Sequence, residues 1–147
     1  MTTDLILAIA HHILVFAIAG LLFAELVLVR PGMTAATATR IARLDSGFGL
    51  AAGLVLVVGF LRVFFGAKPE SYYLENGWFW AKIAAFVVVG LLSARPTVRF
   101  VQWRRAAAAA IPADPPSHEV ATVRRFIHVE AAVFFLVPTF AAVMARV

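Results

Sequence analysis

Four stretches of the chain are apolar enough to cross a lipid bilayer as helices. They cover about residues 5–29, 44–65, 78–98 and 126–146. About 20 residues of α-helix span the hydrocarbon core, whereas the strands of a membrane β-barrel would alternate apolar and polar residues. The pattern therefore predicts an all-α, polytopic membrane protein in which residues 1–147 form one four-helix transmembrane bundle. We expect Pro138 to bend the last helix.

The composition supports this class of protein. Apolar residues make up 63% of the chain and charged residues 14%, against about 45–50% and about 25% in soluble domains. A water-soluble globule and a disordered chain are therefore excluded. The chain contains no cysteine, which excludes disulfides, thiolate catalysis and iron–sulfur clusters.

Basic residues gather on one side of the predicted bundle. The connections at about residues 30–43 and 99–125 lie on the same side of the membrane. With the helix ends beside them, they carry nine arginines: Arg30, Arg40, Arg43, Arg95, Arg99, Arg104, Arg105, Arg124 and Arg125. The opposite side carries only Lys68 and Arg146, if Arg62 and Lys82 lie within the membrane. This asymmetry predicts cytoplasmic connections and both termini outside. It also accounts for the net charge of +5, so we expect no nucleic-acid partner.

The polar residues at membrane depth fall into two layers. The predicted outer layer contains His11, His12, Arg62 and Lys82, and the predicted inner layer contains Glu25, His128 and Glu130. The two layers are roughly 15–20 Å apart along the membrane normal. Two histidines that share a metal ion must each lie within about 2 Å of it. His128 therefore cannot share one ion with His11 or His12.

The outer layer has the residue types that hold a haem. Histidine is the usual axial ligand of haem iron, so His11 and His12 are candidate iron ligands. Adjacent helical residues project about 100° apart, so we expect one to point inward and the other toward a neighbouring helix. Arg62 and Lys82 are candidates to bind the propionates, and a neutral Lys82 is an alternative ligand or proton donor. The alternative is a purely structural role for these residues. In that case the side chains of Arg62 and Lys82 extend to the outer membrane–water interface, and the two histidines form hydrogen bonds with each other or with backbone carbonyls.

The inner layer allows a structural and a functional interpretation. Glu25 follows His11 by fourteen residues, about 40° around the helix, so both should use the same face. The candidate partners of Glu25 are His128, Arg124 and Arg125, and an interhelical ion pair is the structural interpretation. The functional interpretations are a second haem or metal held by His128, or a proton path to the cytoplasm. Glu130 should lie on the side of its helix opposite His128, because about 200° of rotation separates them.

Several short stretches resemble bacterial membrane protein families. His11-His12, Arg30-Pro31-Gly32, Phe60–Gly66 and Phe126–Glu130 are similar to an uncharacterised family of predicted bacterial membrane proteins, over nearly the whole chain. His11-His12 with Trp80-Ala81-Lys82 also resembles, more distantly, the HemJ-type protoporphyrinogen oxidases of bacterial membranes. Those proteins bind haem b and depend on an early histidine and a later lysine.

The HemJ-type resemblance implies haem b with His11 or His12 as its ligand and Lys82 as a second essential residue. It also implies a multi-pass protein of the bacterial plasma (inner) membrane. The chain has Glu25 and Arg30-Pro31-Gly32 where that family carries a Leu-Pro-Arg element, and it lacks the family's Asn-Glu pair. The resemblance therefore implies haem binding more than oxidation of protoporphyrinogen.

Together these observations predict a haem b protein that acts in membrane electron transfer or oxidoreduction. Arg62 and Lys82 are the candidate catalytic residues, and a quinone or a porphyrin is the expected partner because either can enter from the lipid. A second haem at His128, with Glu25 in the same layer, is a further candidate. The competing prediction is a small transporter component, channel or assembly scaffold with Glu25 and His128 as a buried polar switch. A second copy of the chain is a candidate partner in both cases.

Overall fold

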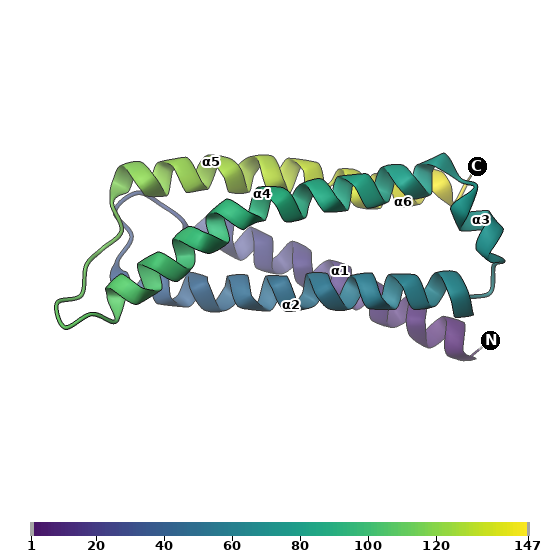
Figure 1. The fold of residues 1–147 in the computed structure, drawn as a ribbon, viewed down its shortest axis with the longest axis horizontal. Coiled ribbons are helices and arrows are strands. Elements are labelled where there is room, and N and C mark those ends of the chain that lie inside the picture. Colours follow the sequence, from purple (N-terminus) through teal and green to yellow (C-terminus); the bar gives the residue numbers. More distant parts are fainter. Residues whose placement is uncertain (1, 147) are drawn as a thin grey trace.

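The structure, a computed structural model, describes residues 2–146, which form six helices (Figure 1). They are α1 (Thr2–Leu28), α2 (Ala35–Phe65), α3 (Glu70–Leu74), α4 (Gly77–Ala107), α5 (Ser117–Phe134) and α6 (Leu136–Met144). Helices α5 and α6 follow each other as one span, so four helical spans are long and apolar enough to cross a membrane. The predicted all-α, polytopic fold is confirmed.

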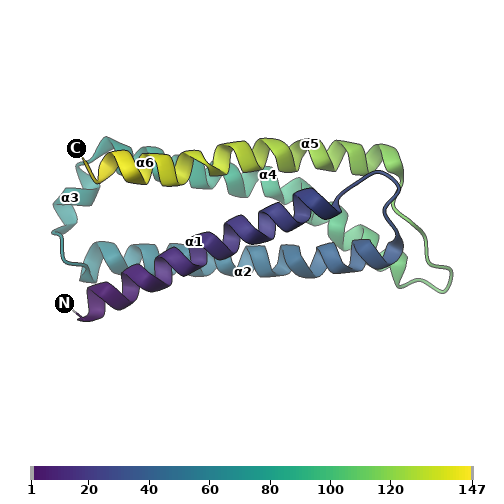
Figure 2. The same ribbon diagram turned by 180° about the vertical axis from the view of Figure 1, so that it is seen from behind.

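The spans form a bundle in which α4, α5 and α6 lie over α1 and α2 (Figures 1 and 2). Helix α2 packs against α1 and α4, α4 packs against α5 and α6, and α1 also contacts α5. Both termini and α3 lie at one end, here called the terminal end, and the connections 29–34 and 108–116 lie at the other, the loop end. The side of the membrane on which each end lies stays a prediction from the arginine distribution.

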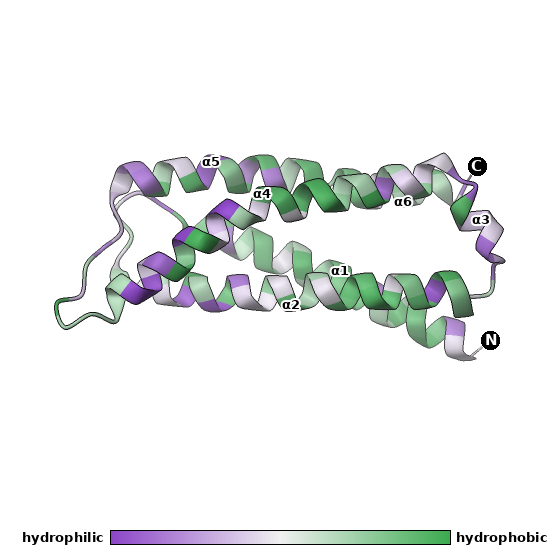
Figure 3. Ribbon diagram, viewed as in Figure 1, coloured by the Kyte–Doolittle hydropathy of each residue, from purple (hydrophilic) through white to green (hydrophobic). Residues whose placement is uncertain are grey.

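Three helices extend further toward the loop end than the hydropathy pattern indicates. Helix α2 begins at Ala35 rather than near residue 44, α4 continues to Ala107 rather than ending near 98, and α5 begins at Ser117 rather than near 126. The 31 residues of α2 give a helix of about 46 Å, longer than the hydrocarbon core of about 30 Å. Hydropathy detects only the part in lipid, whereas alanine and arginine continue a helix into water. The expected connections 30–43 and 99–125 are therefore mostly helical, and polar residues gather on these extensions (Figure 3).

The short connection between α1 and α2 is fixed by local chemistry. Gly32 has a φ of 83°, a left-handed conformation that glycine adopts without steric cost. Thr34 is the N-cap of α2, and its hydroxyl accepts a hydrogen bond from the Thr37 N–H at 3.3 Å. Asp114, from the connection between α4 and α5, accepts another from the Ala35 N–H at 2.7 Å. A carboxylate at a helix N-terminus also interacts favourably with the helix dipole.

The last span is interrupted where Pro138 predicts a bend. Helix α5 ends at Phe134 and α6 begins at Leu136, so Phe135 separates them. Proline has no N–H, so Pro138 cannot donate the hydrogen bond that a continuous helix would place on the Phe134 carbonyl. The missing bond explains why the interruption lies one turn before the proline.

The bundle exposes large apolar side chains and has two buried apolar clusters. Phe16, Leu91 and Phe135 are 74%, 71% and 69% exposed, as expected of residues that face lipid. The larger cluster contains Ile18, Phe48, Phe100, Trp103 and Ile127, and the smaller one, which involves α2, α4 and α6, contains Val63, Phe79 and Met144.

Candidate functional site

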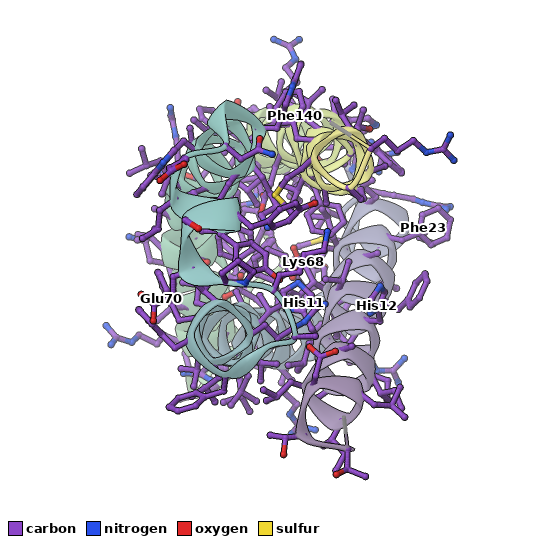
Figure 4. The ribbon with its side chains drawn as sticks, turned by 90° about the vertical axis from the view of Figure 1, so that its right-hand side faces the viewer. His11, His12, Phe23, Lys68, Glu70 and Phe140 are labelled. Atoms are coloured by element: carbon purple, nitrogen blue, oxygen red, sulfur yellow. The ribbon has the colours of Figure 1, made fainter. Side chains whose placement is uncertain are left out.

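His11 is the histidine that faces the interior. It lies on the side of α1 that faces α2 (Figure 4), opposite Gly59. A Cβ atom at Gly59 would lie 3.4 Å from Cε1 of His11, so the glycine lets the ring lie directly against α2. The Val55 carbonyl is near enough to interact with the imidazole, but Nδ1 is buried without a hydrogen bond of normal geometry. An imidazole nitrogen therefore remains available inside the bundle.

His11 lines a small cavity between the four spans. The cavity has a volume of about 70 Å³ and lies where the two apolar clusters meet. Its polar lining comes from His11 and Lys82, and the other lining residues are apolar, among them Val55, Phe86 and Phe134. The cavity is thus an apolar chamber with nitrogen-bearing groups on its wall.

Arg62 of α2 and Lys82 of α4 lie close enough to His11 to interact with it electrostatically. Nε of Arg62 is buried without a hydrogen-bond partner, and Nζ of Lys82 lies 4.9 Å from the centre of the Phe79 ring. The one ion pair found between residues 2 and 146 joins Arg99 to Glu119, so neither cation is paired with a carboxylate. We call His11, Arg62 and Lys82 the basic layer. Its composition suits a ligand that carries negative charge.

His12 is not part of the basic layer. It is exposed, and its ring nitrogen Nδ1 lies 2.7 Å from the Ala8 carbonyl oxygen of the preceding turn. The ring centres of His11 and His12 are 6.3 Å apart. The expectation that the second histidine faces a neighbouring helix is wrong, because His12 points away from the bundle (Figure 4).

His128 also lies on the outer surface. It is exposed, with Nδ1 at 2.7 Å from the Arg124 carbonyl oxygen, and it borders a surface groove with Val129 and Leu136. Glu130 lies on the opposite side of α5 and is only 1% exposed, which confirms the arrangement that the helical rotation predicts. A ligand of His128 would therefore lie at the surface rather than inside the bundle.

The interior contains a second polar group nearer the loop end, made of carboxyl groups. Glu25 of α1, Asp45 of α2 and Glu130 of α5 are 3%, 7% and 1% exposed and lie within electrostatic range of one another. Thr97 of α4 donates a hydrogen bond to Asp45 at 2.8 Å. We call Glu25, Asp45 and Glu130 the acidic layer. That Glu25 and His11 both face inward confirms that they share one face of α1.

Asp45 is the member of this layer that the sequence reasoning missed. The hydropathy pattern starts this helix near residue 44, so Asp45 lies at its expected first turn and is not among the polar residues predicted at membrane depth. The available signal was helical spacing: Ile41, Asp45 and Phe48 follow one another at four and three residues, and all three are buried. A buried stripe at this spacing marks one helix face.

Arg124 does not pair with Glu25. It donates hydrogen bonds to the carbonyl oxygens of Leu26, at 2.8 Å, and Val29, at the C-terminus of α1. A cation there satisfies carbonyls that have no partner within the helix and interacts favourably with the helix dipole. Arg125 and His128 are exposed, so the expected interhelical ion pair of Glu25 is absent from the described residues and Arg124 contacts the backbone of α1 instead.

The basic layer has suitable donors for a haem but little room. A free imidazole nitrogen and two unpaired cations match an axial ligand and two propionate-binding groups. Pockets for small molecules usually have volumes of about 300–1,000 Å³, whereas the cavity beside His11 has about 70 Å³. Within residues 2–146, no group of three or more histidine and carboxylate side chains has the arrangement of a metal site. A haem at this position thus requires the helices to separate.

Long apolar spans, lipid-facing side chains and buried polar layers in the interior define a multi-pass helical membrane protein. Residues 3–147 match the family described as predicted membrane protein (DUF2214), and the chain belongs to this family. The expected membership of an uncharacterised membrane protein family is confirmed. No curated protein and no solved structure matches the chain. The HemJ-type resemblance stays a prediction.

Proposed function

We propose that the basic layer binds a b-type haem and that the protein acts in electron transfer or oxidoreduction in the membrane. The observation that supports this most is the buried Nδ1 of His11, which has no hydrogen-bond partner and lies on an apolar cavity. A polar atom in such a place is costly unless a ligand satisfies it. When bound, a haem supplies one-electron chemistry.

Each residue of the basic layer has a separate role in this proposal. His11 supplies a neutral nitrogen from the interior face of α1. Arg62 and Lys82 supply positive charge for carboxylates, from α2 and α4, which pack against each other. The apolar lining excludes water, which strengthens the interaction of these cations with an anion. The proposed site therefore recognises an apolar molecule that carries carboxylates.

Helix α1 is the element whose movement would enlarge the cavity. It packs on α2 and on α5, but within the described residues no Cα atom of α1 lies within 8 Å of α4 or α6. Figure 2 shows α1 diverging from α6 toward the terminal end. Because the backbone of α1 is not close to that of α4 or α6, movement of α1 would open a path from the lipid to His11. A quinone or a porphyrin could reach the basic layer by the same path.

An absorption spectrum of the detergent-purified protein, produced with sufficient haem, tests the proposal. We expect a Soret band, and α and β bands after reduction. His11→Ala should remove most of the bound haem. His12→Ala is the matched control, because it changes the adjacent residue on the exposed side of α1, and it should leave the spectrum unchanged.

A third variant tests the space beside the ligand, where Gly59 faces the His11 ring. Gly59→Leu keeps His11 but adds a side chain at the wall of the 70 Å³ cavity, so we expect haem binding to fall while the helix content stays the same. A colourless wild-type protein, or a haem spectrum that survives His11→Ala, would overturn the proposal.

A further inference from the structure

The acidic layer has no role in the proposed haem site and carries a separate inference. We propose that Glu25, Asp45 and Glu130 form a proton-binding site, which exchanges protons through the hydroxyl-lined cavity between α2 and α4. The geometry behind this proposal is a group of three buried carboxyl groups from α1, α2 and α5, of which Asp45 lines that cavity.

Among residues 2–146, no cation is paired with these carboxyl groups. On α5, Arg124 is bonded to carbonyls of α1 and His128 points outward. On α4, Arg95 stacks on the Phe126 ring and Arg99 pairs with Glu119. On α2, Arg40 and Arg43 are exposed, and on the connection after α1 Arg30 is exposed. Buried like charges that interact electrostatically in a medium of low polarity cannot all persist, so the group retains protons.

Glu130 is an independent observation that points to a bound proton. It is 1% exposed, and neither of its carboxyl oxygens has a hydrogen-bond partner. Oε1 of Glu25 is also buried and unpartnered. Buried polar atoms in folded proteins are nearly always hydrogen-bonded. A proton on one carboxyl group would provide the donor that the neighbouring acceptors lack.

The cavity beside Asp45 gives this group room for water within the bundle. It has a volume of about 290 Å³ and lies between α2 and α4, and the side chains of Asp45, Ser46, Ser93 and Thr97 contribute to its lining. This volume is larger than one water needs. The three hydroxyl groups donate to the Ala42 and Gly90 carbonyls and to Asp45, so their oxygen atoms are left to accept hydrogen bonds from a water. Water in this cavity would carry protons to and from Asp45.

The proton fits this site better than a larger cation does. Between residues 2 and 146, no three histidine, aspartate or glutamate side chains are arranged to hold a metal ion together. Proton sharing requires only that the carboxyl groups lie near one another or near water, and the acidic layer meets that condition.

Infrared spectroscopy of the full chain in lipid vesicles at neutral pH tests the inference. We expect a C=O stretching band of protonated carboxyl groups that shifts in D₂O. Glu25→Gln and Glu130→Gln should each remove part of the band, and the triple variant that also carries Asp45→Asn should remove nearly all of it. Glu75→Gln is the matched control, because Glu75 is exposed, and it should leave the band unchanged.

A separate variant tests whether protons exchange through the cavity between α2 and α4. Gly90 lines the cavity and has no atom within 4 Å of a built Cβ, so Gly90→Leu should fill the space and slow the D₂O shift at least tenfold. Gly53→Leu adds the same side chain at a glycine outside the cavity and should leave the rate unchanged. The glutamine variants keep the size of the side chain, and circular dichroism shows whether each one folds.

Two results would overturn the inference: the absence of a protonated carboxyl band at neutral pH, or a band that survives in the folded triple variant. An exchange rate that Gly90→Leu leaves unchanged would overturn the proposed route. None of these measurements depends on haem. A colourless protein with the infrared band would reject the proposed haem site and keep the proton site.

Discussion

Arg124 on α5 donates a hydrogen bond of 2.8 Å to the Leu26 carbonyl oxygen in the last turn of α1. The contact joins the first and last spans at the loop end, and it leaves Glu25, one residue before Leu26, without a cation. Arg124, which the sequence suggests as an ion-pair partner of Glu25, therefore caps the C-terminus of α1 instead.

Arg124→Ala should destabilise the bundle. It removes hydrogen bonds from a charged group to the Leu26 and Val29 carbonyls, and one such bond contributes about 1.5–3 kcal/mol. We expect the free energy of unfolding in detergent to fall by about 2–4 kcal/mol. Arg125→Ala, at an exposed position, is the control and should change it by less than about 0.5 kcal/mol. Equal effects of the two variants would show that the contact with α1 contributes nothing.

Thr97→Val should destabilise the contact between α2 and α4. The variant removes the 2.8 Å hydrogen bond to Asp45 and leaves a buried carboxyl oxygen without a donor, which costs about 1–3 kcal/mol. The double variant with Asp45→Leu should recover much of this loss, because both polar partners are then gone. A double-mutant cycle of unfolding free energies measures the coupling, and strictly additive effects would contradict it.

Glu119→Gln should have a small effect. Its ion pair with Arg99 is 3.4 Å long and the two side chains are 27% and 37% exposed. Partly exposed pairs contribute about 0–1 kcal/mol. The amide oxygen can still accept the hydrogen bond from the Trp103 indole, which Glu119 accepts at 3.1 Å. Thermal unfolding of the variant should be nearly that of the wild type, and a loss above about 2 kcal/mol would contradict this ranking.

Pro138→Ala should join α5 and α6 into a continuous helix. The substitution supplies the N–H that the Phe134 carbonyl lacks, and alanine is about 3 kcal/mol more favourable than proline inside a helix. We expect greater helicity by circular dichroism and slower amide hydrogen exchange near Phe135. Unchanged exchange there would mean that packing on α4, rather than the proline, interrupts the span.

Gly32→Ala should destabilise the turn between α1 and α2. The φ of 83° at Gly32 belongs to the left-handed region, where a side chain costs about 1–3 kcal/mol. No atom lies within 4 Å of a built Cβ, so the expected loss is conformational rather than steric. Gly77→Ala, at a glycine with equally open space and no positive φ, is the control in the same unfolding measurement.

The sequence by itself determined the class of protein, the four spans, the presence of both termini at one end and the shared face of His11 and Glu25. These features can be predicted from short stretches of sequence. Hydropathy shows which segments lie in lipid, and the rotation of about 100° per residue shows which side chains share one face of a helix. The same rotation placed Glu130 opposite His128. It could not locate the helix ends outside the lipid, where hydropathy no longer distinguishes helix from connection.

Only the tertiary structure decided which faces point inward. It placed His11 inside and His12 outside, brought Asp45 beside Glu25 and Glu130, and assigned Arg124 to the end of α1 rather than to a carboxyl group. The physical reason is that the interior side of a helix is set by the helices that pack against it. The partner of a residue comes from a helix that is far away in the sequence, and the periodicity of one helix does not show which other helix packs against it.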